Sequence, residues 1–110
     1  MKCLIFIVLI NLSFAKLSLD LIASGFDKPI YVTTAPNNNN ILYVVEQDGY
    51  IRAIDLSNNF SETLFLDIAD RVHLPLFPGD EMGVLGLAFD PNYSQNQLIY
   101  VNYNEHKHKI

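Results

Sequence analysis

Cysteine and basic residues are scarce in this sequence. Cys3 is the one cysteine among 110 residues, which excludes a disulfide within the chain, so an exported domain must be stabilised by its packed core. Lysine and arginine number seven against twelve acidic residues and form no basic stripe. This charge pattern argues against nucleic acid and anionic membrane as partners.

Residues 1–15 have the layout of a secretory signal peptide. Lys2 supplies a basic start, an apolar run follows, and Ser13-Phe14-Ala15 offers a small-x-small cleavage site. The apolar run is too short to span a bilayer, and no later segment reaches about twenty apolar residues. We therefore expect an exported protein, periplasmic or extracellular, without a membrane anchor after cleavage; a buried N-terminal element is the less favoured alternative.

The remaining residues form short β-rich runs separated by turns, with no helical period. Asp48-Gly49 lies between two such runs, and glycine accepts the positive φ that a tight hairpin turn requires. The tract of four asparagines, 37–40, has the composition of a turn. The pattern predicts strands at 17–23, 29–36, 41–47, 50–56, 63–69, 84–89 and 98–103.

A weak internal repeat organises these strands. "AP-N…ILYVV" resembles "DP-N…LIYVN", with four strands per period, as in a β-propeller blade. We therefore predict an all-β fold, a β-propeller represented by about one and a half four-stranded antiparallel blades; a β-sandwich stays open as an alternative. Because a propeller closes with at least four blades, we expect 16–110 to be the incomplete N-terminal part of a longer propeller domain.

The stretches "PIYVTTAP", "ILYVVEQDGYIRAIDL", "LFLDIADRV", "GDEMGVLGLAFDPNY" and "IYVNY" together resemble the opening of the glucose/sorbosone dehydrogenase family. The resemblance runs from about Leu21 to Tyr103 and is most specific in "DEMGVLGLAFDPNY". Asp90 departs from the pattern, since a histidine is common there in the family. The resemblance implies a six-bladed propeller.

The resemblance also implies an exported quinoprotein that oxidises a sugar or aldose, with hydride passing from C1 to pyrroloquinoline quinone beside a calcium ion. The catalytic histidine, the calcium ligands and the cofactor-binding residues would lie beyond Ile110, so the chain alone is expected to be inactive, with a sugar as partner and an unidentified electron acceptor. The alternative is a non-catalytic extracellular propeller that serves as a binding module. A lactonase-type propeller is less favoured.

Glu81 is the one site residue that the resemblance assigns, as a substrate-binding side chain. It precedes an innermost strand that opens on the central channel, so its carboxylate would accept a hydrogen bond from a sugar hydroxyl; an exposed loop charge is the alternative. We expect Asp80 to be solvated or to cap the turn. Gly83 and Gly86 fit a crowded strand where backbones approach closely.

Other polar residues carry weaker signals. His106 and His108 alternate as metal ligands on a strand would, but two histidines fall short of a full ligand set, and His73 fits a loop. Asp67 and Asp70 resemble a feature that closes the blade, with Arg71 as a candidate ion-pair partner. The triplets "NFS" (59–61) and "NYS" (92–94) match the N-glycosylation acceptor, which matters in a eukaryotic secretory route.

Overall fold

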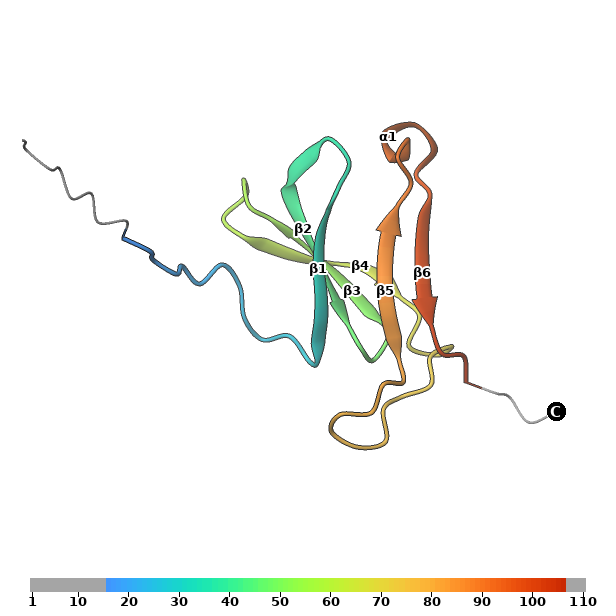
Figure 1. The fold of residues 1–110 in the computed structure, drawn as a ribbon. Coiled ribbons are helices and arrows are strands. Elements are labelled where there is room, and N and C mark those ends of the chain that lie inside the picture. Colours follow the sequence, from blue (N-terminus) through green and yellow to red (C-terminus); the bar gives the residue numbers. More distant parts are fainter. Residues whose placement is uncertain (1–15, 107–110) are drawn as a thin grey trace, which may run out of the picture.

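The computed structural model describes residues 16–106, which form two antiparallel β-sheets (Figure 1). The first sheet is a meander of four consecutive strands and the second is a two-stranded hairpin with one helical turn in its connection. The elements are β1 (Pro29–Ala35), β2 (Asn38–Glu46), β3 (Tyr50–Asp55), β4 (Ser61–Asp67), β5 (Val84–Phe89), α1 (Tyr93–Asn96) and β6 (Ile99–Tyr103). The all-β prediction is confirmed, as one four-stranded propeller blade and the first half of a second.

Most predicted strands are present, but two local predictions were wrong. Residues 17–23 form no strand, and Leu17 and Leu19 are fully exposed (96% and 102%). Alternating leucines form a strand only where a sheet edge accepts them, and none of the described strands pairs with this segment. The asparagine tract is mostly strand: the turn falls at Pro36 and Asn37, and β2 begins at the next residue.

The core lies between the two sheets. Val45, Ile51 and Val84 are completely buried there, and β5 lies against β1 and β2. An aromatic cluster extends this core, because the ring of Tyr43 lies 4.7 Å, centroid to centroid, from the rings of both Phe65 and Phe89. The contact between Tyr43 and Phe89, together with the hydrogen bond from the N–H of Val84 to the carbonyl of Gln47 (2.9 Å), holds the half-blade against the first blade.

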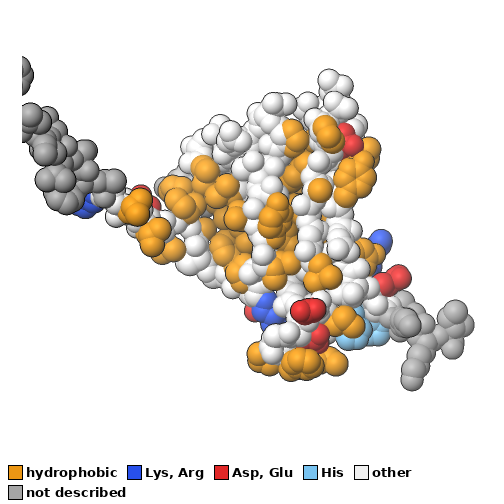
Figure 2. All heavy atoms as spheres, viewed as in Figure 1, with side chains coloured by type: hydrophobic (Ala, Val, Ile, Leu, Met, Phe, Trp, Pro, Cys, Tyr) orange, Lys and Arg blue, Asp and Glu red, His pale blue; other side chains and the backbone are white. Residues whose placement is uncertain are grey.

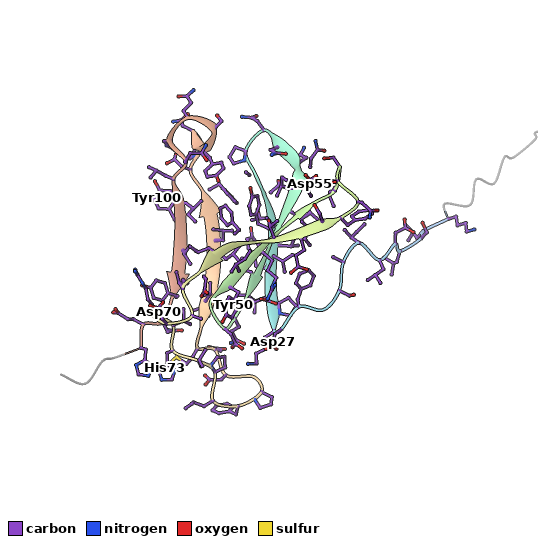
Figure 3. All side chains as sticks on the ribbon, turned by 180° about the vertical axis from the view of Figure 1, so that it is seen from behind. Asp27, Tyr50, Asp55, Asp70, His73 and Tyr100 are labelled. Atoms are coloured by element: carbon purple, nitrogen blue, oxygen red, sulfur yellow. The ribbon has the colours of Figure 1, made fainter. Side chains whose placement is uncertain are left out.

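The strand directions give the molecule two distinct ends. The turns at 36–37, 56–60 and 90–98 form one end, here called the turn end. The hairpin 47–49, the connection 68–83 and residues 104–106 form the opposite one, called the loop end. In Figure 1, α1 lies at the top and loop 74–82 at the bottom, and Figure 3 places Asp55 and Tyr100 towards the turn end but Asp27 and His73 towards the loop end.

The predicted signal peptide, with Cys3, and also His108 lie outside the described residues. Within 16–106, no helix has the length and apolar character needed to cross a membrane.

Candidate functional site

Loop 74–82 projects from the loop end and presents apolar side chains to solvent. Leu76 is 77% exposed and Phe77 63%, and Leu74 is half exposed beside them. Figure 2 shows this apolar cluster at the bottom of the molecule, with acidic and basic side chains directly above it. Apolar side chains gathered on one projecting loop are typical of a surface that contacts another molecule.

Asp80 fixes the shape of this loop. Its carboxylate accepts hydrogen bonds from the backbone N–H of Leu76 (2.9 Å) and of Met82 (3.2 Å). Its own backbone N–H donates to the carbonyl of Phe77 at 3.1 Å, which closes a turn around the exposed ring. The structure thus supports the capping role expected for Asp80 and leaves the apolar side chains on an ordered backbone.

Gln47 attaches the loop to the first blade. Its side-chain amide donates to the carbonyls of Asp80 (2.7 Å) and Met82 (2.6 Å), and its own carbonyl accepts from the N–H of Val84 at 2.9 Å. The sequence does not predict this role of Gln47, because nothing in the residues around it shows which distant backbone its amide will contact.

Gly83 permits this contact and Gly86 does not contribute to it. Gly83 has a φ of +116°, and a Cβ built there would lie 2.3 Å from the carbonyl oxygen of Gln47. The close approach predicted for Gly83 is therefore confirmed. The same prediction for Gly86 was wrong, since a Cβ there would meet no described atom within 4 Å.

Lys28 lines a hollow beside the loop and forms an ion pair with Asp48. The Lys28 ammonium lies 2.9 Å from the Asp48 carboxylate, and this hydrogen bond is the main reason that the pKa of Lys28 is raised above its ordinary value. The hollow has a volume of about 490 Å³ and is lined by Lys28, Gln47 and residues 75–79. An ion pair therefore stands next to the apolar cluster.

Glu46 is a buried carboxylate (1% exposed) under the same end, and sequence analysis missed it as well. It accepts hydrogen bonds from the backbone N–H of Asp27 (2.7 Å) and from Nε of Arg52 (2.9 Å). The Arg52 guanidinium also reaches Glu62 at 2.8 Å, and hydrogen bonds to Glu46 first and then Glu62 raise the pKa of Arg52. With both oxygens occupied, Glu46 has a structural role, fixing the chain that leads into β1.

Glu81 is exposed beside an open hollow of about 710 Å³ that Gln47, Met82 and Asn104 also line. None of the hydrogen bonds and ion pairs found among residues 16–106 involves its carboxylate. A carboxylate placed in this way is available to a ligand, but exposure alone also fits a loop charge. Its binding role stays a prediction.

The other candidate residues within 16–106 make local contacts. His73 and His106 stack at 5.9 Å, and Nδ1 of His73 lies 3.0 Å from the carbonyl of Leu74. Asp67 accepts from the N–H of Ala69 at 3.1 Å, and within 16–106 Arg71 forms no ion pair with it or with Asp70. No three His, Cys, Asp or Glu residues of the described part come together as a metal site would require.

The fold and this end of it define a class of protein: a β-propeller with an ordered apolar loop at one end of its blades. No family model matches the chain. It is similar to Hedgehog-interacting protein of Mus musculus and of Homo sapiens, with 30% identity to each over 88 residues. The matched residues are 80% of this chain but 13% of each relative, so the chain spans a small part of their length.

These relatives correct the functional expectations. Membership of the glucose/sorbosone dehydrogenase family is contradicted, and with it the quinoprotein activity and the sugar substrate, because the matched proteins are named for an interaction with another protein. The stretch "GVLGLAF" indicates a propeller strand, and a strand pattern does not identify what the propeller binds. The residues that would bind pyrroloquinoline quinone and calcium were expected beyond Ile110. The binding of these two groups therefore stays a prediction.

The chain is exported, as predicted, and this agrees with the relatives. The periplasmic part receives no support from proteins of mouse and human.

Proposed function

We propose that this chain is part of an extracellular, non-catalytic β-propeller that binds a protein partner, a signalling protein of the Hedgehog class. The similarity over 88 residues to proteins named for interaction with Hedgehog carries this proposal. The exposed apolar loop at the loop end supports it independently, because protein-binding surfaces concentrate large apolar side chains on an ordered backbone.

The outer faces of the two sheets support the larger propeller. On the first sheet, Val32 and Leu64 are each 54% exposed, and on the hairpin Leu85 and Tyr100 are also exposed. Propeller blades pack face to face, so a neighbouring blade of the same protein would cover each of these surfaces. We therefore propose that 16–110 forms part of a larger propeller domain.

The loop end is the proposed contact surface. Leu76 and Phe77 would enter an apolar recess on the partner, and the carboxylate of Glu81 at the edge would meet a basic group. Because Asp80 and Gln47 already hold the loop backbone, little conformational entropy is lost when it binds. Glu81 thus remains a proposed binding residue, with a protein instead of a sugar as its ligand.

A direct binding experiment tests the partner. The full-length protein, secreted from cultured animal cells, is passed over an immobilised Hedgehog signalling domain, with an unrelated secreted protein of similar charge immobilised as the control. We expect a dissociation constant below about 1 μM, the range of a specific interface. The proposal would be overturned if the protein showed no saturable binding to the immobilised Hedgehog domain at a protein concentration of about 10 μM, tenfold above the expected dissociation constant.

Glu81→Ala refines the same experiment. If the carboxylate meets a basic group at the rim of the interface, the variant should associate more slowly and lose salt dependence, with little change in thermal stability. An unchanged association rate would make Glu81 an ordinary loop charge.

A further inference from the structure

We propose that Asn59 and Asn92 are sites of N-linked glycosylation, so that two glycans stand on the turn end and none stands on the loop end. The proposal requires export through a eukaryotic secretory route but does not depend on which protein the loop end binds. These are the two acceptor triplets in the chain after residue 15, and both have a residue other than proline in the middle position.

Asn59 lies at the tip of the turn between β3 and β4. The turn is closed by a hydrogen bond from the N–H of Ser61 to the carbonyl of Asn58 (3.0 Å), and Asn59 has a positive φ of 51°. Its side chain is exposed and makes no hydrogen bond to the described residues. Within the part of the chain that the structure describes, the side-chain amide is therefore accessible to solvent and to a modifying enzyme.

Phe60, the middle residue of that triplet, is 47% exposed beside the acceptor. The apolar face of the first sugar on Asn59 would cover part of this ring, as aromatic side chains favour contact with flat apolar surfaces. A glycan on Asn59 would thus shield part of an exposed phenylalanine side chain.

Asn92 lies in the connection between β5 and β6, immediately before α1. Its backbone is fully engaged: the N–H donates to the carboxylate of Asp90 (2.9 Å), and the carbonyl accepts from Gln95 (2.8 Å) and Asn96 (3.1 Å). Its side chain makes no capping hydrogen bond and is exposed, as is that of Ser94. A modified Asn92 would therefore keep every backbone hydrogen bond of the turn.

The two acceptors lie at the same end because of the strand topology. Antiparallel strands place the β3–β4 and β5–β6 connections together, and Phe89 at the end of β5 contacts Tyr43 of the first sheet. Loop 74–82 lies beyond the opposite ends of these strands, as Figures 1 and 3 show. Glycans at both positions would leave the apolar loop uncovered.

The modification is a group transfer from a lipid-diphosphate-linked oligosaccharide. The side-chain nitrogen of asparagine bonds to C1 of the first sugar, and the bond from C1 to the diphosphate oxygen breaks. The lipid diphosphate leaves with the electron pair, and the amide nitrogen loses one proton. No oxidant or reductant is needed.

Four variants and glycosidase digestion test the two sites. The chain with its own residues 1–15 is translated in the presence of endoplasmic-reticulum membranes, and the protease-protected fraction is resolved by electrophoresis before and after digestion with an N-glycosidase. We expect two steps of reduced mobility, both removed by the enzyme. Ser61→Ala and Ser94→Ala should each remove one step, whereas Ser61→Thr and Ser94→Thr, which keep the acceptor triplet, should keep both.

Protection from protease shows translocation independently of stable folding, so a poorly folding variant still gives a result. A translocated chain that runs as one species unaffected by the glycosidase would overturn the proposal. Steps that persist in the serine-to-alanine variants would overturn the assignment to these two asparagines.

Discussion

Side-chain hydrogen bonds span longer distances along the sequence at the loop end than at the turn end. At the turn end, hydrogen bonds join close neighbours in sequence: Asp55 bonds to Ser57, and Asp90 to Asn92 and Asn96. At the loop end, the Gln47 amide bonds to backbone 33 and 35 residues away. Contacts between sequence neighbours define the shape of a turn but do not fix its position relative to the rest of the fold. Contacts between distant residues fix the position of the loop against the first blade.

This difference matters for function because the loop end carries the proposed binding surface. An apolar loop held only by its own residues would be mobile and would lose entropy on binding. Gln47, Gly83 and Gly49 prevent this by bringing separate segments into close contact; a Cβ on Gly49 would lie 2.6 Å from Cα of Ala69. Changes at the loop end should therefore cost more than matched changes elsewhere.

The largest expected effect is that of Gly83→Ala. The added Cβ would overlap the carbonyl of Gln47 and hold a non-glycine residue at positive φ, which we expect to lower the free energy of unfolding by about 3 to 5 kcal/mol. Urea titration followed by far-ultraviolet circular dichroism measures it. Gly86→Ala is the matched control, because within 16–106 no atom lies within 4 Å of the added Cβ, and it should change stability by less than about 0.5 kcal/mol. Equal effects of the two variants would contradict the comparison.

These two glycines also show how far the sequence predicts the structure. Turns and strands follow from local chemistry, so Asp48-Gly49 predicts its hairpin and "VLGLAF" its strand. Tertiary contacts do not follow: Gly83 and Gly86 look alike in sequence, yet one meets Gln47 and the other meets open space. Leucines at 17, 19 and 21 alternate like a strand, and only the absence of a partner strand in the described part distinguishes them.

The candidate site was predicted less well for the same reason. Glu81 was assigned through the resemblance to a family that the relatives contradict, so its binding role stays a prediction. The apolar residues of loop 74–82 carry no periodic signal, and Gln47 acquires its role only when the loop folds against it. A propeller strand pattern predicts where a site lies and leaves open what it binds.

Glu46→Ala should have the second largest effect. The variant leaves the backbone N–H of Asp27 and the Nε–H of Arg52 without their acceptor, which we expect to cost about 1 to 3 kcal/mol of unfolding free energy. Glu46→Gln is the control, since its amide oxygen can still accept from Asp27, and it should cost clearly less. Hydrogen exchange of the Asp27 amide should rise in the alanine variant and stay low in the glutamine variant. Loss of the same size in both would assign the effect to charge alone.

A smaller effect is expected for a substitution in the apolar loop, and the quantity measured is the affinity for the partner. Phe77→Ser should weaken binding to the Hedgehog signalling domain about tenfold or more, while thermal stability stays within about 2 °C, because the ring is exposed in the free protein. Phe60→Ser is the matched control: it replaces an exposed phenylalanine at the turn end and should leave binding unchanged. Weakened binding by Phe60→Ser alone would move the proposed surface to the turn end.

The smallest expected effect is the pH dependence of stability that arises from Asp90 and Tyr100 at the turn end. Hydrogen bonds from Asn92, Asn96 and Tyr100 lower the pKa of Asp90 below its ordinary value of 3.8, and its bond to Tyr100 raises the pKa of that phenol above 10.0. A carboxylate with a lowered pKa stabilises the fold above its unfolded pKa and ceases to do so as the pH falls through the folded one. A phenol with a raised pKa stabilises the fold below its unfolded pKa and ceases to do so as the pH rises through the folded one.

The urea midpoint should therefore decline below about pH 4 and again above about pH 10. Asp90→Asn removes the titrating group and should reduce both declines, because the phenol also loses its charged acceptor. Tyr100→Phe should reduce the alkaline decline and leave most of the acid one, since the hydrogen bonds from Asn92 and Asn96 remain. Three hydrogen bonds on one exposed carboxylate make this a local effect, so neither variant should alter binding at the loop end. A pH profile that is the same in both variants and the unmodified protein would show that Asp90 does not stabilise the turn end through its charge.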